Sequence, residues 1–216
     1  MSTVVTPPPP APAPSAPQAA TQSPCAIAIC SNALLILGAQ PITSFDQKTD
    51  KAVLAGNLYP VVRDEVLRSH PWNCCIKRVL LNPDADKPLY DYSYQFTKPR
   101  DWLRTMSVGD YGVEDDFKSE GDKLLADVNP LKLRYVFRNE DACSYDASLT
   151  NVMTLAMAAR MAYAVTQSTA KEQACYQELD MAMKAARNAD AQDDPPETLG
   201  DFRLLASRFT RVRSMI

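Results

Sequence analysis

The chain has 216 residues, a formal net charge of −3 and a sequence pI of about 5.2, which excludes a general binder of polyanions. No apolar stretch reaches the roughly 20 residues that cross a bilayer. The N-terminus lacks the basic and apolar regions of a secretory signal, so we expect neither a membrane span nor a leader.

Residues 1–24 differ in composition from the rest of the chain, because they contain eight prolines and no charged side chain. Such a segment buries too little apolar surface to offset its chain entropy, and alone it favours an extended polyproline conformation. Two interpretations stay open. One is a disordered tail or linker, and the other is a Pro-rich arm that becomes ordered along a neighbouring subunit.

A first helix is predicted directly after this segment. Ser23 followed by Pro24 is a typical helix start, and Gly38 is a typical stop. Apolar residues recur between them at helical spacing: Ile27, Cys30, Leu34 and Leu37. Because further apolar residues lie beside this stripe, we expect a helix that is buried on most sides.

A second helix is expected to begin near Asp50 and to continue through Pro60 as one kinked helix. It should end before Pro71, since the residue that precedes a proline avoids the helical conformation. The residues predicted to share one broad apolar face are Val53, Leu54, Leu58, Val61, Val62, Val66 and Leu67. Residues 72–80 then predict a further short helix.

The period changes to two after residue 80. Aromatic and polar residues alternate over 90–97, which predicts a strand with Tyr90, Tyr92, Tyr94 and Phe96 on one face. Further strands are predicted over 103–108, 113–119, 123–127 and 131–138, with a hairpin turn at 120–122. We therefore expect a small, mostly antiparallel sheet.

Helical periodicity returns at Ser148, and residues 149–165 are almost entirely apolar, as in the middle of a helical bundle. Residues 169–172 match a capping box for a last helix. The apolar stripe of that helix is Cys175, Leu179, Ala182 and Ala186. The prolines at 195 and 196 should end it.

The sequence thus predicts an α+β fold: a helical bundle of about four main helices with an inserted, mostly antiparallel β-sheet region and extended N- and C-terminal arms. The Pro-rich arm takes residues 1–24. The bundle takes 25–80 and 148–192, the β-rich insertion takes 81–147, and a basic C-terminal arm takes 193–216.

The basic C-terminal arm is the most distinctive candidate for binding. Its apolar and basic residues are interleaved on an otherwise acidic chain: Phe202, Arg203, Leu204, Leu205, Arg208, Phe209, Arg211 and Arg213. One interpretation is a frayed basic end. The other is an arm that inserts its apolar residues into a groove on a partner while its arginines pair with acidic residues there. Each exposed ion pair contributes little free energy, but an assembly with several copies of the arm would repeat the contact and gain avidity.

Cysteine chemistry and metal binding are not indicated. The six cysteines, Cys25, Cys30, Cys74, Cys75, Cys143 and Cys175, form no C-x-x-C pair, and His70 is the single histidine. We expect buried or partly buried free thiols in a reducing cytosol. His70 precedes a proline and is interpreted as a helix-end residue.

Catalytic patterns are also missing from the sequence. It contains no G-x-S-x-G and no phosphate-binding glycine loop, so we expect no enzyme and no cofactor. The acidic run at 114–116 is interpreted as a solvated loop. The aromatic strand at 90–96 could stack nucleic acid bases, but acidic neighbours favour packing instead. A cell-wall glycan hydrolase that uses Asp115 and Glu120 stays an alternative.

Several segments in the same order resemble the head-to-tail adaptor family of short-tailed bacteriophages, also called tail tubular protein A. They are SNALLILGAQPI (31–42), LYPVVRDEVLRSHPWNCCIKR (58–78), the run from YDYSYQF to DWLR (90–104), LRYVFRNED (133–141) and the apolar helix at 149–165. The resemblance covers residues 25–190 and leaves out the Pro-rich segment.

The resemblance implies a structural virion protein that is assembled in the host cytoplasm. Copies would form a dodecameric ring beneath the portal protein, continue the DNA channel and support the tail nozzle protein and tail fibres. Double-stranded DNA would pass through without sequence-specific binding. The C-terminal arm would reach the portal, and the strand region with Tyr90, Tyr92, Tyr94, Phe96 and Trp102 would face tail components. The alternative from another class is a monomeric tail-assembly chaperone or helical interaction module.

Overall fold

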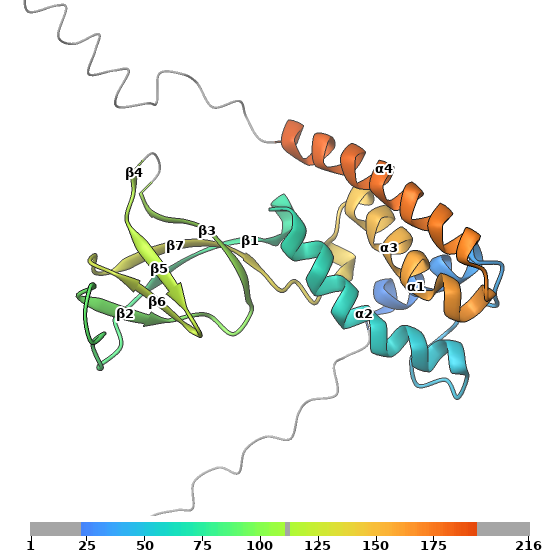
Figure 1. Cartoon of the computed structure of the whole chain (residues 1–216), viewed down its shortest axis with the longest axis horizontal. Helices are drawn as coiled ribbons and strands as arrows, with labels where there is room; N and C mark the ends of the chain where they lie inside the picture. Colours follow the sequence, from blue (N-terminus) through green and yellow to red (C-terminus); the bar gives the residue numbers. More distant parts are fainter. Residues whose placement is uncertain (1–22, 111–112, 194–216) are drawn as a thin grey trace, which may run out of the picture.

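The computed structural model describes residues 23–110 and 113–193 (Figure 1). The fold is α+β, as predicted, with a helical part and a β part that lie side by side. The β part is inserted between the second and third α-helices. Of the predicted arms at 1–24 and 193–216, residues 1–22 and 194–216 lie outside the described residues.

The helical part is built from α1 (Pro24–Ile36), α2 (Asp50–Ser69), α3 (Ala147–Thr166) and α4 (Thr169–Asp193). Helix α3 packs against the other three, and ten of its residues are buried. Its apolar surface therefore has the central position that the sequence predicted.

Local sequence signals explain where α1 begins and ends. Pro24 occupies the first turn, where its missing N–H leaves no bond unmade. Gly38 adopts φ +73°, and the Ala39 N–H donates to Leu34 O at 2.9 Å, which satisfies a carbonyl in the last turn. Both predicted boundary residues are confirmed. A smaller part of the α1 surface is buried than predicted, because Leu35 is 55% exposed.

Helix α2 runs through Pro60 without a break, as predicted, and Thr49 caps it by accepting a hydrogen bond from the Ala52 N–H at 3.3 Å. The predicted apolar face was too broad. Val53 and Val61 are 54% and 60% exposed. The buried stripe is Ala52, Ala55, Tyr59, Val62, Arg63, Val66 and Leu67.

The cap of α4 lies one residue before the predicted capping box. Ser168 Oγ accepts a hydrogen bond from the Lys171 N–H at 3.3 Å. The predicted stripe of this helix is confirmed, since Cys175 and Ala186 are buried and Leu179 and Ala182 pack against the same core.

The helix predicted for residues 72–80 is wrong. A 3₁₀ turn (Asn73–Cys75) leads into strand β1 (Ile76–Leu81), which pairs along its whole length with β7 (Leu131–Phe137). Pairing with a strand 50 or more residues away outweighs the local helical pattern, as tertiary context often does. The predicted end of the helical bundle at residue 80 therefore falls inside a strand.

The β part contains two antiparallel sheets where one was predicted. The larger sheet has the order β1-β7-β3-β4, with β3 (Trp102–Asp110) and β4 (Val113–Glu114). The smaller has the order β2-β6-β5, with β2 (Tyr94–Thr97), β6 (Lys123–Ala126) and β5 (Phe117–Glu120). The predicted hairpin is confirmed, with Gly121 at φ +52° between β5 and β6.

The two sheets enclose a second apolar core. It consists of Phe96, Val108, Leu124, Ala126, Leu131, Leu133 and Tyr135. Strand β7 serves both cores, because Val136 points to the other side and is buried among the helical residues. This shared strand couples the sheets to the helices.

A disulfide joins Cys25 in α1 to Cys143 in the 3₁₀ turn before α3, with their Cα atoms 5.3 Å apart. The prediction of free thiols is therefore wrong for this pair, which the packing of α1 against that turn brings together. Cys30, Cys75 and Cys175 are free and buried, and Cys74 is free and partly buried, as predicted. No helix of the described residues is both long and apolar enough to span a membrane.

Candidate interaction surfaces

The outer face of the β2-β6-β5 sheet forms a hollow of about 540 Å³. We call it the acidic hollow, because four carboxylates and two lysines line it. Its charged residues are Asp91, Asp116, Glu120, Asp127, Lys118 and Lys123, and the aromatic residues Tyr90 and Tyr92 complete it. Burial raises the pKa of Tyr92, and the four carboxylates raise it further. The hollow therefore carries negative potential.

The structure divides the predicted aromatic face into two groups. Phe96 is fully buried, and Tyr94 and Trp102 are partly buried against the same β core. Tyr90, which is 75% exposed, and Tyr92 belong to the loop that precedes β2 and line the acidic hollow. The observed strand begins at Tyr94 and is shorter than the predicted strand at its N-terminal end. Asp91 adopts φ +68°, which breaks the extended conformation there.

Of the two carboxylates proposed for a hydrolase, Asp115 and Glu120, one lines the acidic hollow. Glu120 ends β5 and lines the acidic hollow, whereas Asp115 does not line it. The Asp115 N–H donates to Val108 O at 3.0 Å, which ties that residue to β3 instead. His70 is the residue that ends α2, as predicted.

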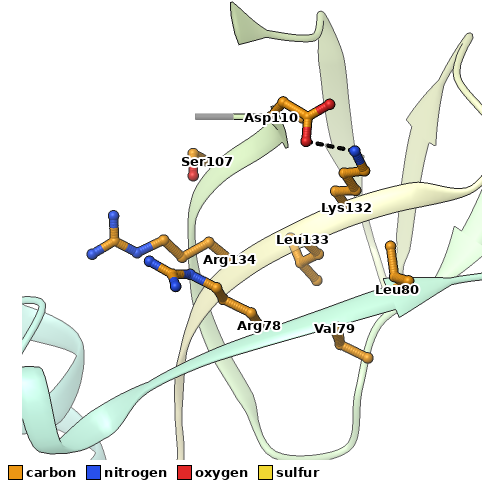
Figure 2. Close-up of a pocket in the computed structure, with 9 residues that line it drawn as sticks. Arg78, Val79, Leu80, Ser107, Asp110, Lys132, Leu133 and Arg134 are labelled. Carbon is orange, nitrogen blue, oxygen red and sulfur yellow. Dashed lines mark hydrogen bonds and ion pairs between the residues drawn. The ribbon is translucent and has the colours of Figure 1, made fainter. Parts of the chain in front are cut away.

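A second hollow, also of about 540 Å³, lies on the outer face of the larger sheet (Figure 2). Three basic side chains and one carboxylate line it, so we call it the basic hollow: Arg78, Lys132, Arg134 and Asp110. Lys132 Nζ donates to Asp110 Oδ1 at 2.5 Å. Leu80, which is 62% exposed, supplies an apolar wall.

Arg78 and Arg134 are direct cross-strand partners in the β1–β7 ladder. Like charges directly opposite each other destabilise a sheet, so this pair carries a cost that an anion would relieve. Arg134 Nε is buried and has no hydrogen-bond partner among the described residues. Asp193, at the end of α4, lines an adjoining hollow with both arginines, but no ion pair joins them.

Sequence reasoning missed the basic hollow. The alternation over 131–138 places Lys132 and Arg134 on one face of a strand, but Arg78 falls in the segment predicted as helix. Only the register of β1 against β7 brings the two arginines together.

A third surface is an apolar groove of about 320 Å³ where α2, α3 and α4 meet. Buried Val62, Val66 and Ala156 form its floor. Its α4 wall is Tyr176, Leu179 and Met183, and Tyr176 is 43% exposed. An ion pair between Arg160 and Glu65 crosses its rim.

The residues predicted for a C-terminal docking arm lie outside the described residues: Phe202, Arg203, Leu204, Leu205, Arg208, Phe209, Arg211 and Arg213. Within residues 23–110 and 113–193, no group of three or more His, Cys, Asp or Glu side chains could hold a metal ion. No protein-family model matches the chain, and no curated protein gives a significant match.

Proposed function

We propose that this chain is a structural virion protein, a head-to-tail adaptor whose copies form a dodecameric ring between the portal and the tail nozzle of a short-tailed phage. The ring continues the DNA channel and supports tail components. The sequence resemblance over residues 25–190 supports the identity of the partners. The apolar surface of the helices supports the formation of a ring.

The apolar groove between α2, α3 and α4 is the observation that carries the proposal. Its floor and its α4 wall are apolar, while Tyr176 leaves 43% of its surface in water. An exposed apolar groove of this kind is a surface that another protein can cover. A helix of a neighbouring copy would cover it, and such contacts between unlike surfaces close into rings when the rotation allows.

The β part and the C-terminal arm supply the other contacts in this proposal. The β part, inserted between α2 and α3, faces the tail components. The C-terminal arm, with its arginines and phenylalanines at 202–213, reaches the portal. Removal of residues 201–216 should therefore weaken portal attachment without altering the described fold.

The test is the mass and image of the purified chain, alone and with portal rings of the same virion. We expect a closed ring. Tyr176→Lys should prevent ring closure, because it places a charge on the apolar groove. The matched control is Tyr163→Lys on α3, since Tyr163 is also an exposed tyrosine, at 51%, but lies outside the groove.

The outcomes separate the alternatives. A chain that stays monomeric with portal rings present would sink the adaptor proposal and favour a monomeric assembly module. Rings formed equally by both tyrosine variants would remove the groove from the subunit contact. Normal portal attachment after deletion of 201–216 would count against the docking arm.

A further inference from the structure

The loop before β2 exposes an apolar tip that no other part of the described chain covers. Leu89 is 96% exposed and Tyr90 is 75% exposed. The loop is nonetheless held at both ends. The Asp84 N–H donates to Gln95 O at 2.8 Å, and the Ser93 N–H donates to Asp127 Oδ1 at 2.8 Å. These two hydrogen bonds fix the ends of the loop, and the exposed tip lies between them.

The basic hollow offers a matching arrangement on the opposite side of the β part. Figure 2 shows the guanidinium groups of Arg78 and Arg134 side by side, with Leu80 away from them along β1. Leu80 and Arg78 are two residues apart on one face of the strand, roughly 7 Å. Leu89 and Asp91 are also two residues apart, so the bent loop presents an apolar and an acidic group close together.

Charge complementarity also favours contact between the loop before β2 and the basic hollow. The basic hollow has three cations and one carboxylate, whereas the acidic hollow beside the loop has four carboxylates and two lysines. An incoming carboxylate would relieve the opposed Arg78–Arg134 pair.

The loop cannot fill the hollow of its own chain. The hollows lie on the outer faces of two different sheets, and the β core of Phe96, Leu124 and Leu133 lies between those sheets. A loop that fills this hollow must therefore come from another copy. A contact between two different surfaces of identical chains closes into a ring when the rotation allows.

We propose that the basic hollow binds the loop at 88–91 of a second copy of this chain, with Leu89 against Leu80 and the Asp91 carboxylate on Arg78 and Arg134. This contact rests on the proposed function, because it adds a second contact to the same ring. The basic hollow is separate from the apolar groove of the helices, so an experiment can disprove either contact without disproving the other.

The test is a thiol cross-link between two variants, Leu80→Cys and Leu89→Cys, mixed under mild oxidation at concentrations where the ring forms. Both positions are exposed. We expect a cross-linked dimer in the mixture and little in either variant alone. The matched control mixes Leu80→Cys with Leu35→Cys, since Leu35 is 55% exposed on α1. Contact should raise the cross-linking yield over this control roughly tenfold through the higher local thiol concentration.

Removal of the charges should abolish the cross-link. Arg78→Gln together with Arg134→Gln, placed in the Leu80→Cys chain, should lower the yield to that of the control, and circular dichroism verifies its fold. High salt should lower the yield in the parent pair. The doubly substituted chain with both Leu80→Cys and Leu89→Cys should give a covalent ladder that ends at the number of copies in the ring.

Other results would overturn the contact. If rings form but the Leu80–Leu89 yield equals the control, this contact is wrong while the adaptor proposal stands. If no ring forms with portal present, both fail. If inorganic phosphate binds the wild-type chain through the two arginines and no cross-link forms, the hollow is a small-anion site instead.

Discussion

His70 Nε2 lies 3.0 Å from Asp190 Oδ2, which joins the end of α2 to the last turns of α4 across 120 residues of sequence. Asp190 is 6% exposed, and its Oδ1 accepts a hydrogen bond from the Asn73 N–H at 3.0 Å. The Asn73 side-chain amide donates to Asp190 O at 2.9 Å. One buried carboxylate thus holds the segment that connects the helices to the sheets.

Asp190→Ala should lower the free energy of unfolding by about 2–4 kcal/mol, because it leaves the partly buried Asn73 N–H and His70 without their acceptor. Urea unfolding followed by circular dichroism measures the loss. The control is Asp180→Ala on the same helix, where the carboxylate pairs with Lys184 in the solvent. That change should cost less than about 1 kcal/mol. Equal losses in the two variants would contradict the role given to Asp190.

The disulfide between Cys25 and Cys143 closes a loop of 118 residues in sequence separation. Cys25→Ala with Cys143→Ala should lower the free energy of unfolding by roughly 2–5 kcal/mol, chiefly because the unfolded chain gains freedom. A reducing agent should lower the Tm of the parent chain and leave that of the double variant unchanged. Titration of the denatured, unreduced parent should find the four thiols of Cys30, Cys74, Cys75 and Cys175. Six thiols would contradict the pairing.

The helices could be predicted from the sequence because their signals are local. Pro24 and Gly38 bound α1, and the apolar residues of α3 follow one another closely in the chain. The β5–β6 hairpin was predictable for the same reason, since Gly121 lies between its two strands.

The missed features depend on contacts between distant residues. Strand β1 takes its conformation from β7, and the pairing of Arg78 with Arg134 follows from that register. Cys25 and Cys143 meet only when α1 packs beside the turn before α3. The candidate surfaces could therefore be predicted only in part: Tyr90 and Tyr92 were identified, whereas the basic hollow was not.

Cys74 should be the most reactive of the free thiols. The thiol of Cys75, 3.6 Å away, donates to Cys74 Sγ and lowers the pKa of Cys74 below the ordinary value of 9.0. The same hydrogen bond, together with burial, raises the pKa of Cys75. Burial raises the pKa of Cys30 to about 12 and raises that of Cys175. As pH rises, Cys74 should form its thiolate first, because its pKa is lowered while those of the other free thiols are raised. It should therefore react first, since the thiolate is the reactive species.

Iodoacetamide labelling of the folded chain across a pH series, read by peptide mass spectrometry, checks this order. The midpoint for Cys74 should lie below pH 9.0, the ordinary thiol value. Cys75→Ala removes the donor and should move the Cys74 midpoint upward. Faster labelling of Cys30 or Cys175 in the native chain would show that the order is wrong.

Two glycines should respond to alanine in opposite directions. Gly56 lies inside α2, where an added Cβ would meet Phe45 Cβ at an ordinary contact distance of 3.5 Å. Gly56→Ala should therefore raise the free energy of unfolding by about 0.5–1 kcal/mol, because alanine loses less backbone entropy in a helix. Gly38 has open space around it but adopts φ +73°, and Gly38→Ala should cost about 1–2 kcal/mol of strain. Urea unfolding of both variants tests the pair. A loss at Gly56 would mean that the helix needs glycine opposite Pro60, whose ring crowds the residue 56 carbonyl, rather than merely tolerating it.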